Sequence, residues 1–399
     1  MKKTLALLLT LALCLSMGTF ALADGVTLKT VSTFAGTDPA TPQYNAILAE
    51  YEQESGNKVE DASATSDEAW KAGVLNDFAA GNEADIMFYF AATADSEPIL
   101  DKVVSIQEIN EAYPELNLTV NELLTEADGN VYAIPVRSFW EGLFVNKDLF
   151  DQFDLELPTD WAKLELAVAT FKENGIVPIA VSLSDIPHYI LEFCILSAGP
   201  ASEHQAKPLS GEAVPESWIK GMEVLRKLNE MGAFAEDVNA TTETITSQLF
   251  RDKKAAMQLD GSWFANGLAQ ENWDNTVVVP FPATEDDADP TAIIGGTSMG
   301  FYMTRKAWDD PAKRDAAVQL LAKLTSDDSV ERMGFVFGGE LLKSAKRMVG
   351  EAKAMCTPIQ DMIDTEVRNY WFSQAPALAD GTADATEVMT KVVNDGAYK

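Results

Sequence analysis

The apolar positions of the first ninety residues alternate between two spacings. Residues 26–33 alternate apolar and polar side chains and are rich in β-formers, which predicts a strand. Residues 43–55 instead place Tyr44, Ile47, Leu48 and Tyr51 on one helical stripe. The predicted order continues with a strand that starts at 58, a helix over 70–80 and a buried strand over 84–90. Strand, helix, strand, helix and strand in this order indicate an α/β lobe with a largely parallel sheet.

The same alternation starts again after residue 140, and no flexible linker separates the two halves. Strands are predicted over 131–136, 141–145, 176–181, 255–259 and 276–279, with further β-like sequence over 293–303. Helices are predicted from 146–150, over 161–174, 214–231, 244–251 and 311–325, and over most of the remainder. The chain is therefore expected to form two α/β lobes.

The N-terminal segment has the features of a secretory signal. A basic pair at 2–3 precedes an apolar run over 5–15 that is short for a bilayer span, and Ala-Leu-Ala at 21–23 offers a cleavage site after residue 23. We therefore expect residues 1–23 to be removed and the mature protein to be secreted or extracytoplasmic, in the periplasm or at the cell surface. Cys14 follows Leu13 rather than a small residue, so the signal for a lipid anchor is poor.

Composition and charge exclude several classes of partner. Of 399 residues, 62 are acidic and 30 are basic, giving a formal charge of -32. Such a chain repels phosphate backbones and anionic lipids, which argues against nucleic-acid and membrane-surface binding. After the signal, Cys194 and Cys356 remain, either as a disulfide or, more commonly, as two buried thiols.

The order and spacing of several short segments carry a family resemblance across nearly all of the mature chain. In chain order these segments are 57–59 (NKV), 76–86 (NDFAAGNEADI), 132–136 (YAIPV), 143–150 (LFVNKDLF), 157–161 (LPTDW), 175–180 (GIVPIA), 253–257 (KKAAM), 260–263 (DGSW) and 295–296 (GG). Together they resemble the family 1 extracellular solute-binding proteins of ABC importers, the carbohydrate-type group that includes maltose-binding protein.

The resemblance implies a periplasmic-binding-protein-like fold of two α/β lobes joined by hinge strands, with the ligand cleft between them. The expected N-terminal lobe comprises 24–136 plus 296–337, and the expected C-terminal lobe comprises 137–295 plus 338–399. The resemblance also implies capture of a small carbohydrate of oligosaccharide size by hinge closure, and delivery to the transmembrane subunits of an ABC permease. It implies a monomer without catalysis, cofactor or metal. A non-sugar solute remains an alternative ligand.

Candidate ligand-binding residues are aromatic and short polar side chains near strand ends, since rings cover the C–H faces of sugars and carboxylates or amides bind their hydroxyls. For Trp263, Tyr89 and Phe90, burial in a lobe core is the alternative. Glu141 has a solvated hinge charge as its alternative, and Asp38 has a turn or helix cap. Gly295 and Gly296 allow close backbone approach, for a ligand or for the hinge. The candidates are Trp263, Glu141, Trp140, Tyr89, Asp38, Trp371, Phe90, Asp185, His188, Asp260, Gly295 and Gly296.

The enzyme interpretations have weaker support. Residues 296–300 match the G-x-S-x-G nucleophile elbow, but that motif needs a helix after Ser298 and a histidine later in the chain. The sequence after Ser298 is β-like, and both histidines, His188 and His204, precede it. The two histidines have no cysteine cluster near them to form a zinc site. A secreted hydrolase of glycosides or esters stays open, because any acidic chain supplies carboxylate pairs.

Overall fold

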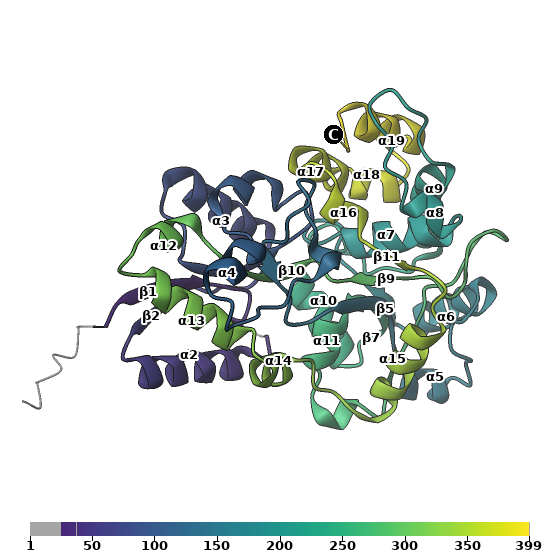
Figure 1. Ribbon diagram of the computed structural model, residues 1–399. Helices are drawn as coiled ribbons and strands as arrows, with labels where there is room; N and C mark the ends of the chain where they lie inside the picture. The colour runs from purple at the N-terminus through teal and green to yellow at the C-terminus, as the bar shows by residue number, and fades with distance from the viewer. Residues whose placement is uncertain (1–24, 37, 399) are drawn as a thin grey trace, which may run out of the picture.

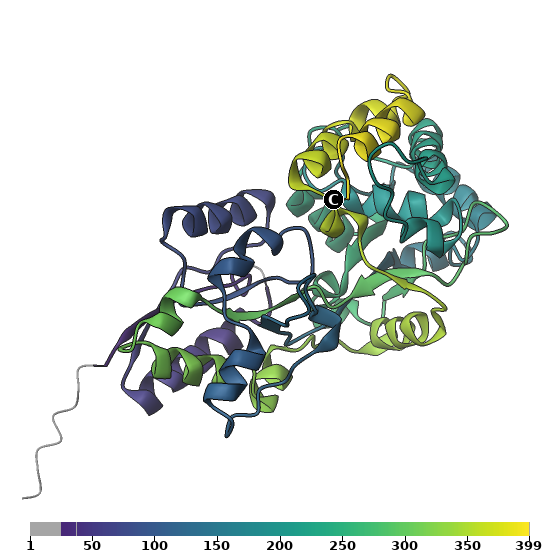
Figure 2. The same ribbon diagram turned by 45° about the horizontal axis from the view of Figure 1, so that its top comes forward.

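A computed structural model describes residues 25–36 and 38–398. The predicted signal peptide and its cleavage site lie outside the described residues. Within the described residues, no helix is both long enough and apolar enough to cross a bilayer. Figures 1 and 2 show two lobes side by side, joined by segments that pass between them.

The N-terminal lobe is built on a five-stranded sheet of order β2-β1-β3-β10-β4. The first three strands along the chain pair in parallel, whereas β10 is antiparallel to both of its neighbours. The strands are β1 (Thr27–Val31), β2 (Lys58–Asp61), β3 (Ile86–Phe90), β4 (Ala133–Ile134) and β10 (Met299–Met303). The helices are α2 (Thr41–Ser55), α3 (Glu68–Ala80), η1 (Glu97–Lys102), α4 (Ile106–Ala112), η2 (Glu122–Leu124), α12 (Arg305–Asp309), α13 (Arg314–Leu324) and α14 (Asp327–Met333).

The C-terminal lobe is built on a six-stranded sheet of order β11-β9-β5-β7-β6, with β8 paired to β5. Its strands are β5 (Phe139–Asn146), β6 (Val177–Ala180), β7 (Ala255–Gly261), β8 (Thr276–Val279), β9 (Ile293–Gly296) and β11 (Met355–Cys356). Its first helices are α5 (Lys147–Gln152), α6 (Trp161–Glu173), α7 (His188–Ser197), α8 (Ala201–His204), α9 (Glu216–Met231), α10 (Glu243–Arg251), α11 (Ser262–Asn266) and η3 (Gln270–Asn272). The remaining helices are α15 (Gly339–Glu351), α16 (Ile359–Met362), α17 (Thr365–Ser373), α18 (Ala375–Ala379) and α19 (Ala385–Asn394).

Each sheet has its own hydrophobic core. Buried residues of the first core come from 28–136 and 301–333, and those of the second come from 143–294 and 356–397. A smaller third cluster, also in the C-terminal lobe, draws on 144–293 and 341–348. Cys194 and Cys356 lie in the second core as free thiols, so the alternative of a disulfide between them is wrong in this structure. Because no core of the described residues spans both lobes, the lobes can move against each other without breaking a core.

Three segments connect the lobes, and the first two, which lead from β4 to β5 and from β9 to β10, pair with each other. The β-like stretch predicted over 293–303 divides into β9 and β10, which belong to different sheets. Phe139 pairs with Gly296 and Trp140 with Gly295, and the Ser138 and Thr297 hydroxyls lie 2.7 Å apart. The third connection runs between α14 and α15. Gly296 has φ 145°, a conformation that favours glycine, so this residue shapes the crossing.

Candidate functional site

A cavity of about 490 Å³ lies between the lobes. The N-terminal lobe contributes the loops after β1 and β2 and the end of β3 to its wall. The C-terminal lobe contributes the loops after β6 and β7, the beginning of β5, and segments near α10 and α16. Loops at the carboxyl ends of strands are where open α/β sheets bind ligands. The hinge segment also reaches the cavity, through Arg137, Ser138 and Phe139.

Aromatic rings form one wall of the cavity. The ring of Trp263, in the first turn of α11, lies 5.8 Å from that of Phe139 and 6.3 Å from that of Tyr189. The ring of His188 lies 4.2 Å from that of Tyr189 and stacks at 6.0 Å on that of Phe372. Trp263 is half-buried, so part of its ring faces the cavity. This wall offers flat apolar surface to a ligand.

Two basic side chains on the opposite wall are already paired. Arg137 donates to Asp38 at 2.6 Å, and its guanidinium lies 4.7 Å from the ring centres of both Phe34 and Phe335. This sandwich joins the loop after β1 to two of the lobe connections. Asp38 therefore orients an arginine at the cavity edge, a role that the sequence did not suggest.

Lys71 is the second paired base. Its ammonium lies 3.4 Å from Asp95 and 3.2 Å from Glu68, and 4.3 Å from the centre of the Phe90 ring. Lys71 and Glu68 lie at the start of α3, whose N-terminus is capped by the side chain of Asp67.

The carboxyl groups of the C-terminal lobe are buried among other acids. Burial, followed by the charges of Glu192, Asp361 and Asp260, raises the pKa of Glu141 well above its ordinary value. Burial raises the pKa of Asp361 to about 7. Burial and the charge of Glu243 raise the pKa of Asp260 to about 8. Asp361 and Asp260 therefore exchange a proton near neutral pH, and the environment of Glu141 favours its protonated form.

A fully buried carboxylate, Glu192, fixes the segment that carries Asp361. It accepts the backbone N–H groups of Ile359 and Gln360 at 3.0 and 2.8 Å. It also lies 2.9 Å from the Nε2 atom of His204. Burial alone would lower the pKa of His204, but its contacts with Cys356 and Glu192 raise it to about 9, so the imidazole is protonated at neutral pH.

The structure brings half of the predicted site residues to this cavity. Those that line it are Asp38, Phe90, Glu141, Asp185, His188 and Trp263. Burial and the nearby charge of Lys71 lower the pKa of His188 to about 3, so the imidazole is neutral. Asp185 accepts the backbone N–H of Glu243 at 2.9 Å, which connects the loop after β6 to α10.

The other predicted residues do not line the cavity. Tyr89 and Trp371 are fully buried in the two cores, although their chain neighbours Phe90 and Phe372 line the cavity. Side chains alternate along a strand and rotate around a helix, so neighbouring residues can face opposite ways, one into the core and the next into the cavity. Trp140 stacks on Phe144 at 5.8 Å.

The remaining three predicted residues support the site from behind. Asp260 is fully buried and accepts the backbone N–H of Gly261 at 2.7 Å. Gly295 permits close packing of the crossing strands, because a Cβ atom there would lie 2.8 Å from the carbonyl oxygen of Phe139. Gly295 and Gly296 thus contribute to the lobe connection.

Several cavity residues were missed in the sequence. They are charged or polar residues on helices and loops, and no short motif distinguishes them from other charges of an acidic chain. They include Lys71, Arg137, Glu243, Arg251, Gln360 and Asp361.

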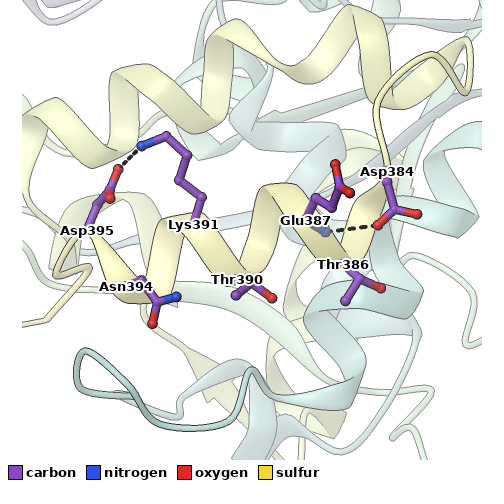
Figure 3. A pocket seen from close by; sticks show the side chains of 7 residues that line it. All are labelled: Asp384, Thr386, Glu387, Thr390, Lys391, Asn394 and Asp395. Carbon is purple, nitrogen blue, oxygen red and sulfur yellow. Dashed lines mark hydrogen bonds and ion pairs between the residues drawn. The ribbon is translucent and has the colours of Figure 1, made fainter.

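A second hollow lies on the exposed side of α19 (Figure 3). Its seven lining residues all come from α19 and its two ends. Lys391 pairs with Asp395, and Asp384 caps the helix through the N–H of Glu387. A surface made by one helix and its ends offers little to a small ligand, because small-molecule sites are concave and enclosed.

The nucleophile-elbow motif does not have the geometry of a nucleophile elbow. Ser298 is followed directly by the strand β10, where the elbow requires a helix.

Residues 37–331 match the sequence profile of the bacterial extracellular solute-binding proteins. The chain belongs to this family. Its family places the protein outside the cytoplasm. Over 228 residues, the chain is 23% identical to the melibiose/raffinose/stachyose-binding protein MelE of Bacillus subtilis (strain 168). That match spans 55% of this chain and 52% of MelE, about half the length of each protein.

Solved structures of solute-binding proteins share the two-lobed fold. A chitin oligosaccharide binding protein is 20% identical with a TM-score of 0.77, covering 92% of this chain and 98% of the other. Maltose-bound MalE3 of T. maritima is 14% identical with a TM-score of 0.73, covering 93% and 99%. The predicted fold class is thus confirmed.

Proposed function

We propose that this protein captures a carbohydrate, of oligosaccharide size, in the cavity between its lobes and delivers it unchanged to the permease of an ABC importer. The observation that carries the proposal is an aromatic wall around Trp263 that faces paired and unpaired charges across one inter-lobe cavity. Its volume of about 490 Å³ lies within the range of about 300–1,000 Å³ usual for small-molecule sites. Relatives named for melibiose, raffinose, stachyose and chitin oligosaccharides support the same class of ligand.

The chemistry of the walls matches the chemistry of a sugar. The ring of Trp263 and its neighbours offer flat surface to C–H faces. Carboxyl groups such as Glu141 and Asp361, and the amide of Gln360, offer partners to hydroxyl groups around the rim of a sugar ring. Residues from both lobes line the cavity, so a bound sugar stabilises the closed arrangement.

We further propose that the lobes comprise 24–136 plus 296–337 and 137–295 plus 338–399, after cleavage behind Ala23. The protein acts as a monomer, and its partners are the transmembrane subunits of the permease. A sugar that binds and leaves without reaction requires no catalytic group.

A thermal-shift experiment with a panel of mono- and oligosaccharides tests this function. A ligand that binds the folded state alone raises the unfolding midpoint, and the shift grows with its concentration. Trp263→Ala should lose the shift. The proposal is wrong if amino acids, polyamines or oligopeptides raise the midpoint while no saccharide does. Turnover of model glycosides or esters by the pure protein would favour a hydrolase.

A further inference from the structure

Glu141 is a buried acid without a partner on the cavity wall. It stands near the beginning of β5, is 3% exposed and lines the cavity. Its Oε2 atom accepts no hydrogen bond from any residue that the structure describes. The charges that act on it belong to the acids Glu192, Asp361 and Asp260. An ionised carboxyl group in this position lacks a compensating cation.

The nearby bases are engaged elsewhere. Lys71 pairs with Asp95 and Glu68, and Arg368 donates to the same two carboxylates at 3.0 and 2.8 Å. Both bases act on Asp361 only through space.

The other two arginines on the cavity wall do not compensate the charge of Glu141. Arg137 is held by Asp38. Arg251 lies over the ring of Phe264, its Nε atom has no hydrogen-bond partner among the described residues, and its charge acts on Glu243 rather than on Glu141. Among the described cavity residues of the C-terminal lobe, the four acids Glu141, Asp185, Glu243 and Asp361 therefore outnumber the two arginines, Arg137 and Arg251.

An aromatic face lies beside this acid. Glu141 is paired in register with Gly261, and the indole of Trp263 folds back over Gly261. A Cβ atom on Gly261 would lie 2.3 Å from that indole ring. The carboxyl group and the ring therefore share one corner of the cavity. A carboxylate beside an aromatic face is a favourable environment for an ammonium group.

We propose that the captured carbohydrate is an amino sugar whose protonated amine binds Glu141 and Asp361 beside Trp263. This inference rests on the proposed function and specifies its ligand. A neutral sugar would leave Glu141 either ionised without a cation or protonated, whereas an ammonium group compensates the charge and donates hydrogen bonds.

Isothermal titration with matched sugars tests this inference. The probes are glucosamine and galactosamine, the β-1,4-linked di- and trisaccharides of glucosamine, and the N-acetylated form of each, which keeps the ring and loses the charge. We expect the amine form to bind about tenfold tighter or more than its N-acetylated counterpart, as for a hydrogen bond between charged groups.

Glu141→Gln keeps the shape of the side chain and removes its charge. The variant should abolish the preference for the amine and change the affinity for the N-acetylated sugar far less. Asp361→Asn provides a second removal of charge if Glu141→Gln does not fold. Glu387→Gln, on the exposed face of α19, is the matched control and should leave both affinities unchanged.

The outcomes separate the two proposals. If N-acetylated sugars bind as tightly as the amines, or if the preference survives both variants, the amine is wrong and the sugar-binding function stands. If no saccharide of either kind binds while another solute does, both proposals are wrong.

Discussion

Replacing Arg368 with methionine is expected to weaken ligand binding, because this arginine joins the two lobes. It is fully buried on α17 of the C-terminal lobe, and it donates to Asp95 at 3.0 Å and to Glu68 at 2.8 Å in the N-terminal lobe. Figure 1 shows α17 beside α3 at this junction. The ion pairs exist only while the lobes are in contact, so their loss penalises the closed form and spares the open one.

The structure sets the size of this effect. Removing one partner of a buried ion pair costs about 3–5 kcal/mol. The lower end applies here, because Lys71 stays 3.4 Å from Asp95 and the Glu68 side chain is 42% exposed. A cost of about 3 kcal/mol corresponds to a dissociation constant raised roughly a hundredfold.

Isothermal titration with a saccharide found by thermal shift measures this change, and urea unfolding of the ligand-free variant measures its stability. Arg305→Met is the matched control, since Arg305 binds Glu108 at 2.7 and 2.9 Å within the N-terminal lobe. The control should lose stability and keep its affinity. An Arg368→Met variant that loses stability and binds the sugar as the wild type does would refute the inter-lobe role.

Three further predictions concern the cavity and the cores. Trp263→Ala should weaken saccharide binding by about 2 kcal/mol or more, roughly thirtyfold, as measured by titration; unchanged affinity would remove the aromatic wall from the site. The raised pKa of Asp361, about 7, means that the folded state holds a proton that the unfolded chain releases near its ordinary value. The stability that this proton contributes is thus complete below that ordinary value and falls as pH rises toward 7. Asp361→Asn lacks this dependence. In calorimetry, the unfolding temperature of the variant minus that of the wild type should therefore increase between about pH 5 and about pH 8. A constant difference would contradict this linkage. Gly221→Ala should cost about 1–3 kcal/mol in urea unfolding, because the new Cβ atom would lie 2.6 Å from the Cα atom of Ile195, whereas Gly73→Ala, with nothing within 4 Å, should stabilise α3 by about 0.5–1 kcal/mol. Equal stabilities of the two variants would contradict the close packing of α7 on α9.

The spacing of apolar residues, which differs between strands and helices, predicted the order of most elements, because most strands and helices bury one face. The helix α2, with Tyr44, Ile47, Leu48 and Tyr51 buried, follows its predicted stripe. The helix α7 was not predicted: all but its first residue are buried, so it has no polar face and no helical period. The predicted helix over 311–325 is α13, shorter than expected because a turn at 310–313 separates it from α12.

The site was predicted only in part, for a related reason. A candidate at a strand end was predicted correctly when the alternation of side chains turned it toward the cavity, as for Phe90. The prediction failed when the alternation turned the side chain into the core, as for Tyr89. Arg137, Lys71 and Asp361 become neighbours of the cavity only after distant segments fold together. Spacing along the chain carries no signal for such contacts.

The most direct test of the account uses the pure protein and a mixed pool of oligosaccharides. After equilibrium dialysis, the sugars retained by the protein are released, and their molecular masses are measured by mass spectrometry. The account predicts that one class of saccharide is retained, that its mass is unchanged, and that Trp263→Ala retains none. Retention that is equal in the variant, or fragments of the added sugars, would contradict capture in the inter-lobe cavity without reaction.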